Sequence, residues 1–280
     1  MSDAGTDRVR VFYGIDFSGN HRMWTSGCRR SNVWIATAQE RSGDLSLVDL
    51  RPVQQLRGRG HPFDRLVALL ANDDYCAVGI DAPFSLPERH MPEGGWPGLL
   101  RDIAALPKDG RPFPRGEELV AYAERNVCLA EPKPLRRTEK LWRGRGLNVR
   151  STLWDGARGG AAFTIACLTL LERVRAPTWP WSNDDRLLVE AFPACQLLEW
   201  GLEHRGYASS YPSPEREDIV IRVSERIEIP DGLREQCHCS PDALDAVLCL
   251  FAAKAAFEGL AAVGDEAAAE GEGWIAVHPA

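Results

Sequence analysis

The chain has 280 residues, of which 44% are hydrophobic and 26% are charged. This composition excludes an intrinsically disordered protein, and the length fits one large domain or two small ones with ample material for a hydrophobic core. The formal net charge of −7 excludes an overall basic nucleic-acid coat but leaves local basic patches open. No apolar run in the sequence approaches the roughly 20 residues of a membrane span, and residues 1–10 are too polar for a signal peptide. We therefore expect a cytoplasmic protein with no membrane partner.

The first third of the chain predicts a mixed sheet. Residues 9–17, 32–39 and 45–50 are expected to form strands, because apolar side chains dominate or alternate in them. Turn residues at 41–44 should join the second and third strands in a hairpin. A helix at 63–70, which has helical apolar spacing, should precede a short buried strand at 75–80. This order predicts a fourth strand parallel to the first.

The segment 88–160 is rich in Pro, Gly and Arg, and we expect it to be irregular except for one helix at 116–130. So long an insertion within a compact domain is usually functional or mobile. We expect residues 1–280 to form a single domain around it. The remaining predicted elements are helices at 161–174 and 194–204, a fifth strand at 186–191, a weak helix at 214–229, a helix from Ser240 and Pro241 to about residue 263, a solvated loop at 264–273 and a last strand at 273–278.

Five acidic residues stand in apolar surroundings. Asp16, Asp81 and Glu190 come at or near the ends of predicted strands, and Asp242 and Asp245 share one face of the last long helix. Carboxylates at the tips of buried strands are costly to desolvate, and several together raise one another's pKa. A hard cation, Mg²⁺ or Mn²⁺, relieves both effects because it prefers carboxylate oxygens. The sequence therefore predicts a metal site held by Asp16, Asp81, Asp242 and Asp245.

Each of these residues also has a structural interpretation. Asp242 suits the first turn of a helix because of the helix dipole. Asp16 could be a turn residue, Asp81 a cap on the following loop, and Glu190 an edge carboxylate before a helix start. The apolar neighbours of Asp245 fit a solvated position poorly. It is the conjunction of these positions at strand ends and a helix start that favours a shared site.

One basic segment stands out in this acidic chain. Residues 131–158 contain eight cations against three acidic residues, with two tryptophans among them. Arginines bind phosphates and tryptophans stack on bases, so the segment is a candidate substrate-binding surface. A solvated loop with aromatic anchors is the alternative. The substrate-binding residues that we predict are Arg136, Arg137, Lys140, Arg143 and Arg145.

Other site chemistries have weaker support. Cys237, His238 and Cys239 are the one clustered set of soft metal ligands, but no second pair stands at the spacing of a structural zinc site. The chain has no Walker-type phosphate loop and no Gly-x-Ser-x-Gly elbow. We therefore expect reduced, non-ligating cysteines.

Four segments resemble the motifs of an uncharacterised family of predicted RNase H-like nucleases, DUF429. They are residues 13–16, 78–87, 189–194 and 241–246, in the family's order, and the resemblance extends from about residue 10 to 278. Their spacing is similar to that of Holliday-junction resolvases, whose first-strand Asp, fourth-strand acid and Asp-x-x-Asp pair on the last helix bind two metals. Asp16, Asp81, Asp242 and Asp245 match these positions, with Asp81 where the resolvases have a longer Glu. The resemblance implies an α/β fold of RNase H-like type, with a mixed sheet flanked by helices and a large basic insertion after the fourth strand.

The function expected from this resemblance is hydrolysis of nucleic-acid phosphodiester bonds that depends on Mg²⁺ or Mn²⁺. Asp16 would bridge two metals, and Glu190 would be a further ligand or orient water. The arginines of the insertion would hold the phosphate backbone. Two alternatives remain open: a phosphohydrolase or phosphotransferase acting on a small phosphorylated metabolite, and a non-catalytic nucleic-acid-binding module.

Overall fold

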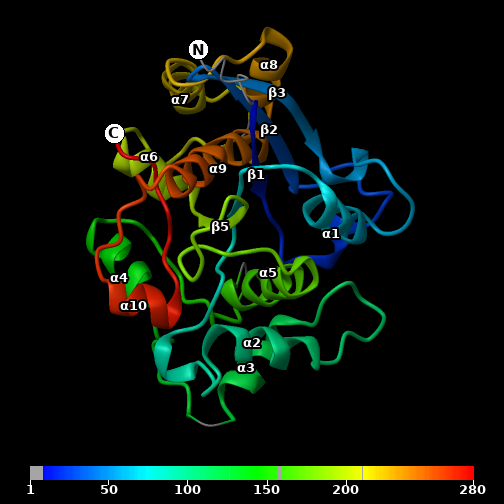
Figure 1. Cartoon of the computed structure of the whole chain (residues 1–280), viewed down its shortest axis with the longest axis vertical. Coiled ribbons are helices and arrows are strands. Elements are labelled where there is room, and N and C mark those ends of the chain that lie inside the picture. The colour runs from blue at the N-terminus through cyan, green and yellow to red at the C-terminus, as the bar shows by residue number, and fades with distance from the viewer. Residues whose placement is uncertain (1–8, 126, 157–158, 210) are drawn as a thin grey trace, which may run out of the picture.

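A five-stranded mixed sheet forms the centre of the computed structural model, which describes residues 9–125, 127–156, 159–209 and 211–280 (Figure 1). Residues 1–8 of the polar N-terminus and Arg158 of the basic segment lie outside this description. The strands are β1 (Arg10–Asp16), β2 (Trp34–Arg41), β3 (Asp44–Pro52), β4 (Ala77–Asp81) and β5 (Leu187–Ala191), in the order β3-β2-β1-β4-β5. The first three strands are antiparallel neighbours, and β4 is parallel to both β1 and β5. The predicted parallel pairing of the first and fourth strands is confirmed.

The β2–β3 hairpin is closed by two residues in left-handed conformations. Ser42 has a φ of 52° and Gly43 a φ of 93°, and two such residues match the right-handed twist of the flanking strands. The predicted hairpin is therefore confirmed. The outer edge of β3 is covered by a segment from much later in the chain. Its residue Glu228 exchanges two backbone hydrogen bonds with Leu45 and Leu47 (2.9 and 2.8 Å).

The two faces of the sheet carry different helices. Helix α9 (Pro241–Phe257) covers one face and packs on Phe12 of β1, whereas Tyr13 and Ile15 belong to the core shared with α1 (Pro62–Asn72) and α5 (Gly160–Val174). The alternation follows from the two-residue period of a strand. It decides on which side of the sheet every acidic residue at a strand end must lie.

Helix α9 touches the backbone of the sheet directly. A Cβ atom added at Gly14 would lie 2.0 Å from the carbonyl oxygen of Ala246, and one added at Gly79 would lie 2.0 Å from that of Cys249. Only glycine allows so close an approach. The two glycines therefore seat α9 across β1 and β4.

The remaining helices correct several expectations. Segment 88–160, expected to be irregular apart from one helix, contains four short elements, and α8 and α10 were not predicted. The additional elements are η1 (His21–Trp24), η2 (Val53–Gln55), η3 (Glu88–His90), α2 (Gly95–Ala104), α3 (Gly116–Ala123), α4 (Arg137–Gly144), α6 (Pro193–Glu199), α7 (Pro214–Ser224), α8 (Asp231–Cys239) and α10 (Glu266–Glu272). Helices α2, α3 and α5 gather below the sheet in the view of Figure 1, and α7 and α8 lie above it.

The C-terminal expectations were wrong in detail. Helix α9 ends at Phe257 rather than near residue 263. Gly259, two residues after this end, adopts a φ of 69°, which does not continue the helix. Residues 266–272 form α10, with Ala268 and Ala269 buried, instead of a solvated loop. Residues 273–278 run past β5 without forming a strand, and Ala276 donates one backbone hydrogen bond to Glu190 (2.9 Å). Nowhere in the described ranges is there a helix with the length and apolar character needed to cross a bilayer.

The close contact at Gly79 generates a stability prediction. Gly79→Ala should lower the free energy of unfolding by about 3 kcal/mol or prevent folding, because the new methyl group meets the α9 backbone rather than a movable side chain. Gly144→Ala is the matched control, since nothing lies within 4 Å of a Cβ there and alanine favours the helix by about 1 kcal/mol. Urea denaturation of both variants would settle the point, and a Gly79→Ala protein as stable as the wild type would show that α9 sits elsewhere.

Candidate functional site

Asp16 and Asp81 lie side by side at the carboxyl ends of β1 and β4. They are register partners in the parallel ladder, so their side chains point to the same face of the sheet, the face that α9 covers. Neighbouring strands are about 4.8 Å apart, which brings the two carboxylates close together. Asp16 is only 7% exposed. A backbone hydrogen bond from Phe17 favours the charged form of Asp16 and so partly offsets the cost of its burial.

Asp242 and Asp245 reach this place from the start of α9. Ser240 caps the helix by accepting a hydrogen bond from the Ala243 amide (3.2 Å), and this fixes the orientation of the first turns. The Tyr207 hydroxyl donates a hydrogen bond to Asp245 Oδ1 (2.8 Å). One carboxylate oxygen of Asp245 is thus oriented by a residue from outside the helix.

The pKa values show that the four aspartates interact. Burial raises the pKa of Asp16 well above its ordinary value, and the charges of Asp245, Asp81 and Asp242 raise it further. Burial followed by the charge of Asp81 does the same for the pKa of Asp245. Burial, followed by the charge of Glu190 across the sheet, raises the pKa of Asp81 to about 7. Burial raises the pKa of Asp242 to about 6, although the charge of Arg216 lowers it. The structure therefore brings together all four residues predicted to hold a metal, as a repelling cluster.

The donor groups of this cluster are carboxylates from β1, β4 and α9. Among the described residues, no group of three or more His, Cys, Asp or Glu side chains is already arranged as a metal-ligand set. The donor chemistry does suit Mg²⁺ or Mn²⁺, because every side chain of the cluster is a carboxylate and these cations prefer carboxylate oxygens. In contrast, Cys237 is buried and Cys239 is exposed, which does not suit a shared zinc ion.

Glu190 does not join the aspartates. It pairs with Ile80 in the β4–β5 register and so lies on the opposite face of the sheet from Asp81. Both of its oxygens bind the Arg136 guanidinium, at 2.7 Å for Nη1–Oε2 and more closely for Nη2–Oε1, and the Phe84 amide also donates to Oε2 (2.9 Å). This corrects the expectation that Glu190 is a further metal ligand or orients water.

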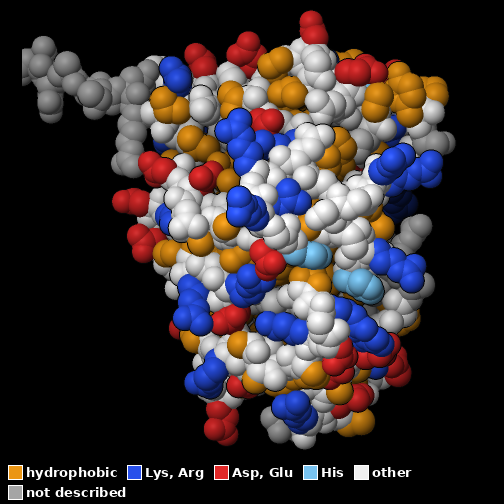
Figure 2. Space-filling model, turned by 90° about the vertical axis from the view of Figure 1, so that its right-hand side faces the viewer, with side chains coloured by type: hydrophobic (Ala, Val, Ile, Leu, Met, Phe, Trp, Pro, Cys, Tyr) orange, Lys and Arg blue, Asp and Glu red, His pale blue; other side chains and the backbone are white. Residues whose placement is uncertain are grey.

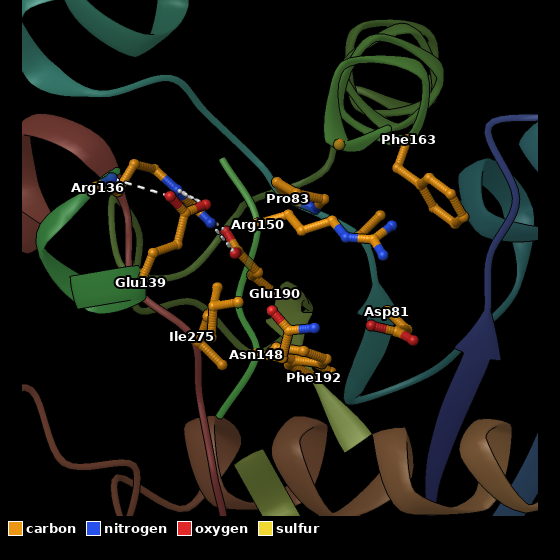
Figure 3. A pocket seen from close by; sticks show the side chains of 14 residues that line it. Asp81, Pro83, Arg136, Glu139, Asn148, Arg150, Phe163, Glu190, Phe192 and Ile275 are labelled. Atoms are coloured by element: carbon orange, nitrogen blue, oxygen red, sulfur yellow. Dashed lines mark hydrogen bonds and ion pairs between the residues drawn. The ribbon is translucent and has the colours of Figure 1, made fainter. Parts of the chain in front are cut away.

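Arg136 is likewise an interior residue rather than a surface contact. It is 1% exposed, and its Nε also donates to Glu139 Oε1 (3.1 Å), as the dashed lines of Figure 3 show. Burial raises the pKa of Glu139 to about 7, although the charge of Arg136 pulls it down. The predicted role of Arg136 in holding substrate is corrected accordingly: it neutralises two buried carboxylates.

The other predicted cations lie at the surface, and each has its own surroundings. Arg145 pairs with Glu199 (2.7 Å) and lies 4.4 Å from the centroid of the Trp142 ring. Arg143 donates to the carbonyl of Val149 (2.6 Å). Arg137 and Lys140 are exposed on α4 beside a hollow that also contains Glu88 and Glu272. Their part in binding substrate stays a prediction.

A second group of cations was missed by sequence reasoning. Arg111, Arg22 and Arg115 lie near enough to His21 for their charges to add to burial in lowering its pKa. An aromatic contact holds the two segments together, with the Trp24 and Phe113 ring centroids 6.4 Å apart. The two segments are about ninety positions apart in the sequence, so no local pattern could have shown this.

This group lies on the side of the molecule that carries α1 and the segment after β1. Figure 2 shows Lys, Arg and His side chains across the middle and lower part of that side. His21 follows Asp16 by five residues, so the two Cα atoms are at most about 18 Å apart.

A cavity of about 280 Å³ opens beside Asp81 (Figure 3). Its walls come from the exit of β4, residues 148–150, the first turn of α5 and the exit of β5. The Arg136–Glu190–Glu139 network lines it from within. The cavity therefore lies between the two sets of charged residues.

Comparison with known proteins identifies the family and nothing further. Residues 14–269 match the family described as a protein of unknown function, DUF429, and the chain belongs to this family. No curated protein and no solved structure is significantly similar to the chain.

The buried network predicts a large effect of removing Arg136. Arg136→Met should lower the free energy of unfolding by about 3–5 kcal/mol, because Glu190 and Glu139 are left without a counter-charge. The double variant Arg136→Met with Glu190→Gln should recover part of the loss. Arg137→Met, an exposed neighbour, is the control and should change stability little. Chemical denaturation of the four proteins measures this, and an Arg136→Met protein of normal stability would restore the surface interpretation.

The aspartate cluster predicts a pH dependence of stability. Because the native pKa of Asp81, about 7, exceeds its ordinary value of 3.8, the native state binds this proton more tightly than the unfolded state. In metal-free buffer the free energy of unfolding should therefore fall as the pH rises from about 4 to about 7. Asp81→Asn should flatten this fall and be more stable than the wild type at pH 8 by on the order of 2 kcal/mol.

The control for this experiment is Glu270→Gln, an exposed carboxylate of α10. Its stability should follow that of the wild type at each pH. If thermal melts between pH 4 and 8 show Asp81→Asn to be less stable than the wild type throughout, Asp81 is a structural cap and not part of a repelling cluster.

Proposed function

We propose that the chain is a metal-dependent nuclease of RNase H-like architecture that hydrolyses phosphodiester bonds by a two-metal carboxylate mechanism. The observation that carries the proposal is the gathering of Asp16, Asp81, Asp242 and Asp245 from three separate elements, each with a raised pKa. The strand order, three antiparallel strands followed by two parallel ones, supports the architecture. The family itself is without an assigned function, so the proposal rests on the site.

The four aspartates are the residues that would hold the cations. When bound, Mg²⁺ or Mn²⁺ supplies an activated water and stabilises the charge of the leaving oxygen. The chain's own contribution is to keep the carboxylates in place before the cation arrives. Ser240 fixes the start of α9, and the Tyr207 hydroxyl orients Asp245.

The phosphate backbone requires cations outside the carboxylate cluster. Arg22, Arg111 and Arg115 supply them on the side that carries α1, and the exposed residues of α4 supply others. Contacts of this kind position the substrate without reading its sequence. Binding should therefore be salt-dependent and largely independent of sequence.

A phosphohydrolase or phosphotransferase acting on a small phosphorylated metabolite is the second candidate. The cavity beside Asp81 favours it, because about 280 Å³ is near the lower limit of about 300 Å³ for ligand pockets. A non-catalytic nucleic-acid-binding module is the third alternative, and it would show binding without metal-dependent turnover.

Metal binding can be tested without knowing the substrate. Mn²⁺ should raise the melting temperature of the wild type, since a cation that binds only the native state stabilises it by mass action. Asp16→Asn should be at least as stable as the wild type without metal and should lose the response to Mn²⁺. Glu270→Gln should keep the full response. A destabilised Asp16→Asn protein that still responds fully to Mn²⁺ would show Asp16 to be a structural residue.

Salt dependence distinguishes a polymer from a small substrate. The logarithm of the binding constant for an oligonucleotide should fall linearly with the logarithm of the salt concentration. Joint replacement of Arg22, Arg111 and Arg115 by Ala should flatten this slope by about one unit per lost phosphate contact. The same replacement of Arg137, Lys140 and Arg143 compares the two cationic surfaces. Fluorescence anisotropy with labelled single- and double-stranded DNA and RNA measures both.

The same measurements can also favour the second candidate, an enzyme acting on a small phosphorylated metabolite. If the wild type neither binds these oligonucleotides in a salt-sensitive manner nor cleaves them with Mg²⁺ or Mn²⁺, the nuclease proposal fails. Metal-dependent release of phosphate from a small ester would then support the metabolite enzyme.

A further inference from the structure

The cavity beside Asp81 is formed by segments that are far apart in the sequence. Phe163 comes from the first turn of α5 and Phe192 from the exit of β5, and Figure 3 shows the two rings on different sides of the cavity, with Asn148 near Phe192. Phe192 packs against a small core cluster that contains Trp142 and Ile275, so this wall is anchored. The cavity is therefore a pocket whose walls include two phenylalanine rings, a polar amide and the Arg150 side chain.

The inner end of the cavity offers no place for a phosphate. Each guanidinium nitrogen of Arg136 already has a protein acceptor, namely Glu139 for Nε and Glu190 for Nη1 and Nη2. Glu190 and Glu139 would moreover repel an anion. A phosphorylated ligand would therefore place its organic part inside the cavity and its phosphate outside, at the Asp81 end.

The cavity is also linked to Asp16, through the contact between the segment after β1 and the start of α5. A Cβ atom added at Gly19 would lie 2.5 Å from the backbone nitrogen of Phe163, so the segment that leaves β1 after Asp16 packs directly on the start of α5. A Cβ atom added at Gly160 would lie 2.1 Å from the carbonyl oxygen of Ser151. These backbone contacts hold Phe163 between the exit of β1 and the cavity.

We propose that this cavity is a nucleobase pocket, in which Phe163 and Phe192 flank one unstacked base and Asn148 hydrogen-bonds its edge. The proposal rests on the proposed function and specifies its substrate. A planar base suits a small cavity between aromatic rings, and the side-chain amide of Asn148 offers both a donor and an acceptor.

The size of the pocket also selects the form of the nucleic acid. Bases in a duplex are stacked and paired, and they enter a pocket only after they are flipped out. An unpaired base of a single strand meets no such cost. The substrate class is therefore a single-stranded or unpaired nucleotide, with the phosphate next to the base lying at the aspartates.

Isothermal titration calorimetry with matched ligands tests the pocket. The probes are a nucleoside 5′-monophosphate and the sugar 5-phosphate that lacks the base, each titrated into the full-length protein with Mn²⁺ present. The wild type should bind the nucleotide at least about tenfold more tightly. Phe163→Ala and Asn148→Ala should lose this preference and bind the base-free phosphate as the wild type does.

Two further variants keep the test independent of folding. Phe163→Leu preserves much of the apolar volume but removes the ring, and it should also lose the preference. Tyr211→Ala, at a residue that is 55% exposed, is the control and should keep it. Equal wild-type affinity for the two ligands, or Phe163 variants that weaken both equally, would overturn the proposal.

The two proposals fail in different ways. If the protein cleaves oligonucleotides but has no preference for the base, the pocket proposal is wrong and the nuclease proposal stands. If it prefers the nucleotide but cleaves no oligonucleotide with either metal, the pocket stands and the substrate is a free nucleotide.

Discussion

The contact between α9 and the backbone of β1 and β4 is the constraint on which the candidate site depends. At Gly14 and Gly79 the helix lies so close that no Cβ atom fits, and this seats the start of α9 near the ends of both strands. Nearly every apolar residue of α9 is buried, so the hydrophobic contact outweighs the repulsion between the carboxylates that it brings together. The packing of the fold thus creates a local excess of negative charge.

The alternation of side chains along a strand then separates two sets of acids. Asp16 and Asp81 point toward α9, and Glu190, one residue out of phase with them, points to the other face. There Arg136 supplies a counter-charge from a distant segment. One set of acids is therefore neutralised by an arginine within the protein, whereas burial and mutual repulsion raise the pKa values of Asp16 and Asp245 in the other set. That difference, rather than the number of carboxylates, singles out the aspartates as the functional candidates.

The elements with strong local patterns were predictable from the sequence. The hairpin, α1 and the parallel pairing of β1 with β4 follow from apolar periodicity, turn residues and chain order. Helices α4 and α10 were missed because each is short and has few large apolar residues of its own. Helix α4 begins with a capping box in which Glu139 reaches back to Arg136, and α10 is buried through contacts made elsewhere. The aspartates were predictable because Asp16 and Asp81 end strands and the other two lie in the first turns of α9. The partner of Glu190, in contrast, stands 54 positions away.

The central claim is that Asp16, Asp81, Asp242 and Asp245 hold divalent cations. The most direct measurement is anomalous X-ray diffraction from a crystal of the protein soaked in Mn²⁺. The claim predicts one or two anomalous peaks among these four carboxylates, within about 2.3 Å of their oxygens, with Tyr207 still beside Asp245. A map with manganese bound elsewhere and none among the aspartates would contradict it.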